Sequence, residues 1–186
     1  MSLTAFVLAS LAILLTPGPT NTLLAAAGAA GGIRRGVMLP AAEGIGYAVA
    51  IGAFLGATRY LSDVGFALPV LKATAAIWLL VSAARLWGQP VRIDATERLG
   101  AMRRVFVTTV LNPKAMLVGT IVIPTLMPDQ ALLGLLCFVA LSGLAGILWL
   151  TMGSVLPLRA RPYAYKGAAL ILAAFSVAAA SSSLAG

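Results

Sequence analysis

Two charged residues lie inside long apolar stretches, and they are the side chains best placed to do chemistry. Glu43 lies in the apolar stretch 37–58, and Lys114 lies in the stretch 105–127. A charge inside a membrane-spanning helix costs about 2.5–3.5 kcal/mol on insertion scales, so it usually has a partner or a task. We expect the two charges to share a cavity, where Lys114 meets a carboxylate and Glu43 meets an amine or a proton.

A less specific role is open for each charge. Glu43 can instead rise to the membrane interface and pair with Arg34 or Arg35, and the stem of Lys114 can extend to the interface. At helical rise, Lys114 lies roughly 14 Å and Glu43 roughly 9 Å from the same membrane face, so a direct pair is geometrically possible. For Lys72, near the outer end of its stretch, extension to the interface is the favoured interpretation.

Prolines interrupt two of the apolar stretches at corresponding places. A proline inside a helix removes one backbone hydrogen bond and blocks another, and in lipid such a break persists only where it faces protein or a hydrated cavity. The breaks predict half-helices whose exposed N–H groups attract anions, with Asn112 as an N-cap and Pro113 at the first helical position. Two packing kinks are the alternative interpretation. The candidate binding or coupling residues, besides the two charges, are Pro17, Gly18, Pro19, Asn21, Asn112 and Pro113.

The composition of the chain excludes most soluble classes. Of 186 residues, 61% are hydrophobic and only 10% are charged, and the mean hydropathy is +1.02. A soluble domain carries roughly 25% charged residues, so a soluble enzyme, a disordered chain and a nucleic-acid-binding module are all excluded. The chain has no His and one cysteine, Cys137, so we expect no metal site, no disulfide and no cofactor. An integral membrane protein remains, with the lipid bilayer as its partner and no nucleic acid.

The apolar stretches predict six membrane-spanning helices, since about 20 apolar residues cross the hydrocarbon core. The all-α fold is expected to hold them as two inverted three-helix repeats: residues 1–88, a cytoplasmic linker at 89–104, and residues 105–186. Lys72 and Lys166, and likewise Ser82 and Ser176, occupy matching positions of the two halves, 94 residues apart. The predicted spans are 3–24, 37–58, 64–84, 105–127, one within 130–158, and one from 166 to near the C-terminus.

The distribution of basic residues predicts the orientation. Ten of the 13 Lys and Arg residues lie in the connections 1–2, 3–4 and 5–6. Basic residues favour the cytoplasmic side, so both termini are expected on the non-cytoplasmic side. Gly52 and Gly56 form a weak dimerisation motif, and a binding cavity at a dimer interface would suit so short a chain, so a homodimer is possible.

Three motifs together resemble the LysE/RhtB family of bacterial amino-acid exporters. They are Thr16-Pro17-Gly18-Pro19, Gly32-Ile33-Arg34-Arg35-Gly36 and Leu111-Asn112-Pro113-Lys114-Ala115. The resemblance implies a bacterial cytoplasmic (inner) membrane protein that exports amino acids or related metabolites, driven by a proton or ion gradient. It carries over Pro17, Gly18, Pro19, Asn112, Pro113 and Lys114 as the site. The chain departs from the family pattern at Glu43, where an apolar residue is usual, so the substrate is not assumed to be threonine or lysine.

The expected function is therefore secondary-active export of amino acids or related small zwitterions, with a small-molecule substrate. A metal or cation transporter of the wider superfamily is the alternative, which the absence of His and the shortage of intramembrane acids disfavour. A thiol-disulfide carrier needs two cysteines and is excluded. A membrane enzyme needs a larger polar cluster than one Glu and one Lys, so no enzymatic activity is expected.

Overall fold

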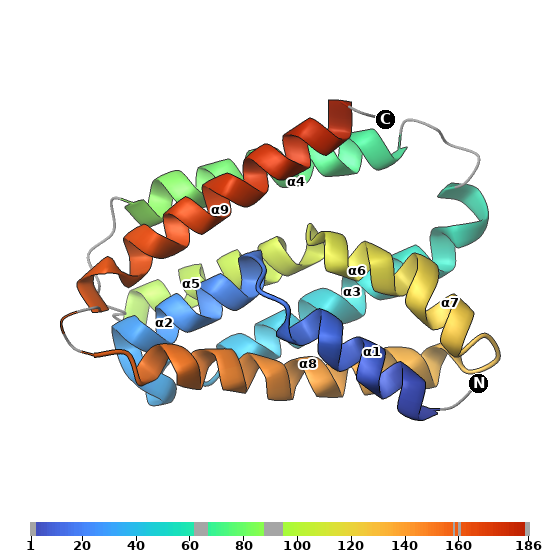
Figure 1. Cartoon of the computed structure of the whole chain (residues 1–186), viewed down its shortest axis with the longest axis horizontal. Coiled ribbons are helices and arrows are strands. Elements are labelled where there is room, and N and C mark those ends of the chain that lie inside the picture. Colours follow the sequence, from blue (N-terminus) through green and yellow to red (C-terminus); the bar gives the residue numbers. More distant parts are fainter. Residues whose placement is uncertain (1–2, 62–66, 88–94, 158, 160, 185–186) are drawn as a thin grey trace.

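The chain folds as a bundle of helices. The computed structural model describes residues 3–61, 67–87, 95–157, 159 and 161–184, which include helices and turns but no strand. The expected all-α fold is thus confirmed over this part of the chain (Figure 1). The elements are α1 Leu3–Leu15, α2 Pro19–Gly36, α3 Leu39–Leu61, α4 Ala67–Trp87, α5 Ala95–Val110, α6 Pro113–Leu117, the π-helix η1 Val118–Val122, α7 Ile123–Leu126, α8 Ala131–Ser154 and α9 Arg161–Leu184.

Several of these helices can cross a membrane. Within the described residues, Leu39–Ala57 and Ala131–Ser154 are each long and apolar enough to do so. Two bent pairs, α1 with α2 and α5 with α6–α7, raise the number of candidate spans to four if each pair counts as one. The chain is therefore a multi-pass membrane protein. That α4 and α9 also cross the membrane, giving six spans, stays a prediction.

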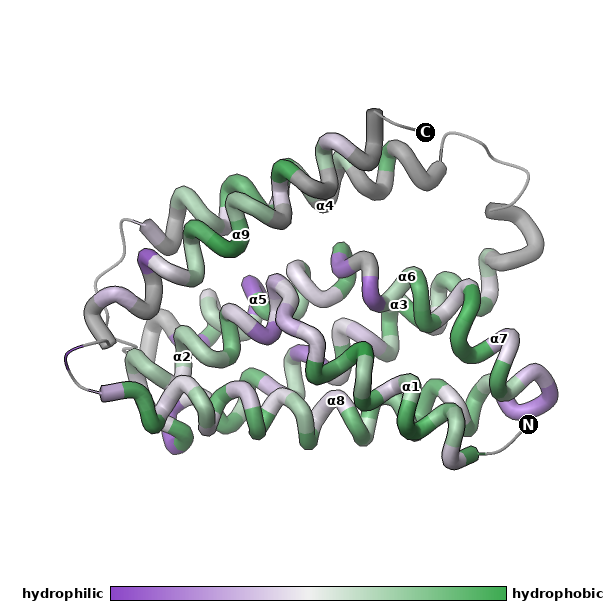
Figure 2. Tube along the Cα trace, in the orientation of Figure 1, coloured by the Kyte–Doolittle hydropathy of each residue, from purple (hydrophilic) through white to green (hydrophobic). Residues whose placement is uncertain are grey.

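The two bends lie at the predicted prolines. The axis turns by 61° between Leu3–Leu15 and Pro19–Gly36, and by 47° between Arg98–Val110 and Lys114–Leu126. Figure 2 shows apolar residues along most of α1 and α8, and a hydrophilic turn where α7 meets α8. The start of α1 and the end of α9 both lie toward that same end of the bundle in Figure 1.

The helix boundaries differ from the predicted spans in two places. Residues 95–104, predicted as the second part of the linker, already form the first turns of α5. Their charges keep this segment from being a membrane span, but Ala, Leu, Met and Arg are all good helix formers, so nothing prevents a helix there. The helix after the first break continues to the residue before Gly32, well beyond the predicted end at residue 24, and the left-handed backbone of Gly32 (φ 71°) separates it from a last helical turn that ends at Gly36. Residues 89–94 of the predicted linker, residues 64–66 of the predicted third span and the side chain of Lys72 lie outside the described part of the chain.

Helix α2 packs against α8 through glycines. A Cβ added to Gly28 would overlap the backbone carbonyl of Leu150, and one added to Gly153 would overlap that of Ala25. The two backbones therefore touch, as small residues permit in membrane proteins. This contact fixes α2, and with it the break that precedes α2, against the long helix α8.

Helices α4 and α9 lie side by side in Figure 1 and run in opposite directions. The Ser176 hydroxyl on α9 donates a hydrogen bond to the carbonyl oxygen of Ala76 on α4, at 2.8 Å. The indole nitrogen of Trp78 on α4 donates a hydrogen bond to the hydroxyl of Thr108 on α5, at 2.9 Å. Side chains of α4 and α9 share one buried apolar cluster with α2, which joins this pair to the rest of the bundle.

We expect Gly153→Ala to destabilise the protein by about 1–3 kcal/mol, because the added methyl group overpacks a backbone contact. Denaturant titration of the purified protein in mixed micelles measures this change. Gly143→Ala is the matched control on the same helix, since no atom lies within 4 Å of its added Cβ. Equal stability of the two variants would contradict the α2–α8 contact.

Candidate functional site

The break between α1 and α2 is held by side chains that bind its free carbonyl groups. The amide of Asn21 donates to the carbonyl oxygens of Leu14 at 2.8 Å and Thr16 at 3.0 Å. The indole of Trp149, on α8, also donates to Leu14 at 3.4 Å. Thr22 donates two hydrogen bonds to the carbonyl oxygen of Gly18, one from its backbone N–H and one from its hydroxyl, each at 2.9 Å. The break is therefore an ordered backbone feature.

The second break has the predicted cap. Asn112 is the N-cap of α6, and its side chain accepts a hydrogen bond from the backbone N–H of Lys114 at 3.0 Å. Pro113 is the first residue of α6, where its missing N–H costs nothing. The helix then widens into the π-helix η1, in which Gly119 lies so close to α3 that an added Cβ would be 2.7 Å from the Cβ of Phe54.

The two breaks meet at Lys114. Its ammonium group donates a hydrogen bond to the carbonyl oxygen of Thr16, in the middle of the first break. A Cβ added to Gly18 would lie 3.2 Å from both Cε and Nζ of Lys114, so the lysine side chain runs alongside this glycine. Lys114 is half-buried and its hydrogen bond to Thr16 is exposed, so extension of its stem to the interface stays an alternative prediction.

A chain of buried hydrogen bonds also joins the two breaks. The amide of Asn112 donates to the hydroxyl of Thr20 at 3.2 Å, and the hydroxyls of Thr20 and Thr109 are 3.2 Å apart. Thr109 gives its only hydroxyl proton to the carbonyl of Val105 at 2.8 Å. Thr20 must then donate to Thr109, so the direction of every bond in this chain is fixed.

Glu43 is enclosed in the bundle. Its side chain is 1% exposed, so the alternative of an interfacial pair with Arg34 or Arg35 is wrong. A Cβ added to Gly146, on α8, would lie 2.6 Å from Oε2 of Glu43, so the carboxylate occupies space that only a glycine leaves open. The charge of Lys114 acts on Glu43, but Oε2 has no hydrogen-bond partner. The two charges are therefore near each other without the direct pair that their depth allows.

Of the other predicted site residues, most are buried at the two breaks. Gly18, Pro19, Asn21 and Asn112 are buried, whereas Pro17 is exposed. The side chain of Pro113 lies outside the described part of the chain. Sequence reasoning missed the site contributions of Thr109 and Trp149. Thr109 precedes Asn112 by one helical turn and so lies on the same face, which was the one local signal available.

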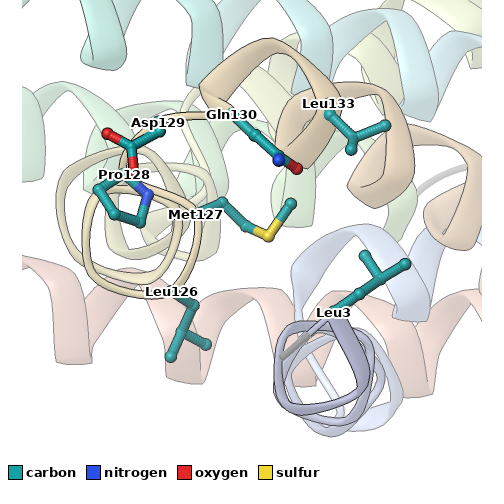
Figure 3. Close-up of a pocket in the computed structure, with 7 residues that line it drawn as sticks. All are labelled: Leu3, Leu126, Met127, Pro128, Asp129, Gln130 and Leu133. Atoms are coloured by element: carbon teal, nitrogen blue, oxygen red, sulfur yellow. The ribbon is translucent and has the colours of Figure 1, made fainter. Parts of the chain in front are cut away.

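A separate pocket of about 210 Å³ lies at the turn between α7 and α8 (Figure 3). Leu3 and Leu133 approach it from α1 and α8, and the turn residues Asp129 and Gln130 border it. No residue of the two breaks lines this pocket, so it is not part of the candidate site.

Comparison with known proteins does not assign the chain to a family. The chain matches no family model, no curated protein and no solved structure. The functional argument therefore depends on the residues at the two breaks.

We expect Asn21→Ala to destabilise the protein by about 1–3 kcal/mol, because it removes one hydrogen-bond donor from the buried carbonyl of Leu14 and one from the part-buried carbonyl of Thr16. The change is measured by the same micelle titration. Gln130→Ala, at an exposed turn, serves as the control and should have little effect. An Asn21→Ala variant as stable as the control would show that the amide does not support the break.

Proposed function

We propose that this protein is a secondary-active exporter of amino acids or related small zwitterionic metabolites, driven by a proton or ion gradient across the bacterial cytoplasmic membrane. One observation carries the proposal: two broken helices from opposite halves of the chain meet around the ammonium group of Lys114. Broken helices whose half-helix ends meet in the membrane are typical of the substrate sites of secondary transporters.

Lys114 has the capacity to bind a carboxylate. An ammonium group has three N–H donors, and the Thr16 carbonyl takes one of them. The first turn of α2 begins beside this ammonium group at Pro19, and the free N–H groups of such a turn favour an anion. The remaining donors of Lys114 and the start of α2 thus favour the same kind of group.

The arrangement of the helices as inverted repeats, and their orientation in the membrane, belong to the same proposal. We take the six helices to form two inverted three-helix repeats, with both termini on the non-cytoplasmic side. The support is the corresponding position of the two breaks and the burial of Ser82 and Ser176, which are 94 residues apart. The motif resemblance to the LysE/RhtB family favours this arrangement as well.

A homodimer is also part of the proposal. Among the described residues, no atom lies within 4 Å of a Cβ added to Gly52 or Gly56 on α3, which leaves room there for a partner helix. Open glycines permit close approach of a second membrane helix.

Lys114→Met should lower amino-acid counterflow in proteoliposomes by about tenfold or more, because it removes a charge-assisted hydrogen bond to the substrate carboxylate. Radiolabelled amino acids reveal the loss, measured with a pH gradient across the vesicles. Lys166→Met is the control, since Lys166 is exposed and lies 5.9 Å from the ring centre of Trp87, away from both breaks. Normal counterflow in Lys114→Met would exclude the carboxylate role.

Growth of an expression host separates the proposal from its alternative, a metal or cation transporter. An exporter of zwitterions raises tolerance to toxic amino acids or peptides. Tolerance to heavy metals alone would contradict the proposal.

A further inference from the structure

Three buried oxygen atoms in the bundle have no hydrogen-bond partner. They are Oγ of Ser10, Oε2 of Glu43 and Oη of Tyr47, whose side chains are 0%, 1% and 0% exposed. Among the described residues, these are the buried side-chain nitrogen and oxygen atoms left unpaired. A buried polar atom without a partner costs about 1–3 kcal/mol, and three in one chain therefore need an explanation.

The three atoms belong to one region of the bundle. Glu43 and Tyr47 are one helical turn apart on α3 and interact electrostatically. Ser10 lies on α1 between Phe6 and Leu14, which are one turn away on either side. Phe6 and Leu14 pack in the same apolar cluster as Tyr47.

Packing restricts the positions of the two α3 groups. The ring of Tyr47 meets that of Phe138 edge to face, with 5.2 Å between ring centres, and this contact fixes where its hydroxyl can lie. Gly146 provides the space for the Glu43 carboxylate, as described above. Both restraints come from α8, so α3 and α8 together hold the region in place.

The charges around Glu43 do not pair with it. The sequences of α1 and α8 contain no charged residue. Lys114 on α6 acts on Glu43 across the interior, but its ammonium group binds the Thr16 carbonyl. The other ionisable side chains described on helices packed against α3 are Cys137 of α8 and the arginines Arg34, Arg35, Arg98, Arg103 and Arg104 of α2 and α5.

We propose that the enclosed carboxylate of Glu43 is a buried proton-binding site. A proton from water adds to Oε2 of Glu43 and forms an O–H bond, and on release this bond breaks and the proton returns to water. Proton binding neutralises a carboxylate that is costly to bury ionised. A proton is the occupant that needs no cavity among packed helices.

Coupling of this proton to transport rests on the proposed exporter function, whereas proton binding itself does not. Infrared difference spectroscopy of the full-length protein in lipid therefore tests the site directly, with the pH stepped over the range in which the protein stays folded. We expect a carboxylic-acid C=O band that grows as the pH falls and shifts in heavy water. The band should be lost completely in Glu43→Gln and retained in Asp129→Asn, whose side chain is exposed at the α7–α8 turn.

Two further variants keep the test informative. Tyr47→Phe removes the neighbouring unpartnered hydroxyl of α3 at nearly constant volume, so the band should remain. Glu43→Asp should retain a band at an altered frequency, and it replaces Glu43→Gln if circular dichroism shows that the latter does not fold.

The proposal is overturned if the folded wild type shows no such band, or if the band persists in Glu43→Gln. It is also overturned if sodium or methylammonium removes the band at constant pH, since the site would then bind a cation. If the band behaves as expected but amino-acid counterflow is absent in the wild type, the exporter function fails and the proton site stands.

Discussion

The structure depends on one constraint: backbone carbonyl groups freed inside the bilayer must find donors within the protein. Water is absent from the hydrocarbon core, and each unsatisfied group there costs several kcal/mol. The prolines at 17 and 19 free carbonyl groups in the first span. Asn21, Trp149 and Lys114 provide donors for them. The arrangement of α1, α2, α6 and α8 around the break follows from that requirement.

The same constraint explains why a lysine is tolerated there. An ammonium group needs acceptors, and the broken helix offers a carbonyl oxygen that no helical N–H can reach. The break and the charge therefore stabilise each other, and neither would be stable alone in lipid. The hydrogen bonds from Asn112 through Thr20 to Thr109 fix the two broken helices relative to each other, so the lysine is held close to Gly18.

Local sequence predicted the features that have local causes. Prolines act on their own helix, so both breaks and the cap at Asn112 follow from a few adjacent residues. The contact between Thr20 and Thr109 joins residues 89 positions apart and depends on tertiary packing that no local pattern encodes. The burial of Glu43 was undetermined for a similar reason. Its depth fitted both the interface and the interior, and the outcome depends on Gly146, which lies on another helix.

Lys114 and Glu43 thus differ in how completely the fold satisfies them. The ammonium group of Lys114 has one acceptor within the protein, the carbonyl oxygen of Thr16, and retains two further donors. The carboxylate of Glu43 has a buried oxygen without a donor, and the hydroxyl groups of Ser10 and Tyr47 are likewise buried without a partner. Local conflicts of this kind are costly, and in native proteins they concentrate at functional sites. The fold provides donors for carbonyl groups of the broken helix but none for Oε2 of Glu43, and this contrast supports the proposed binding of a proton at that carboxylate.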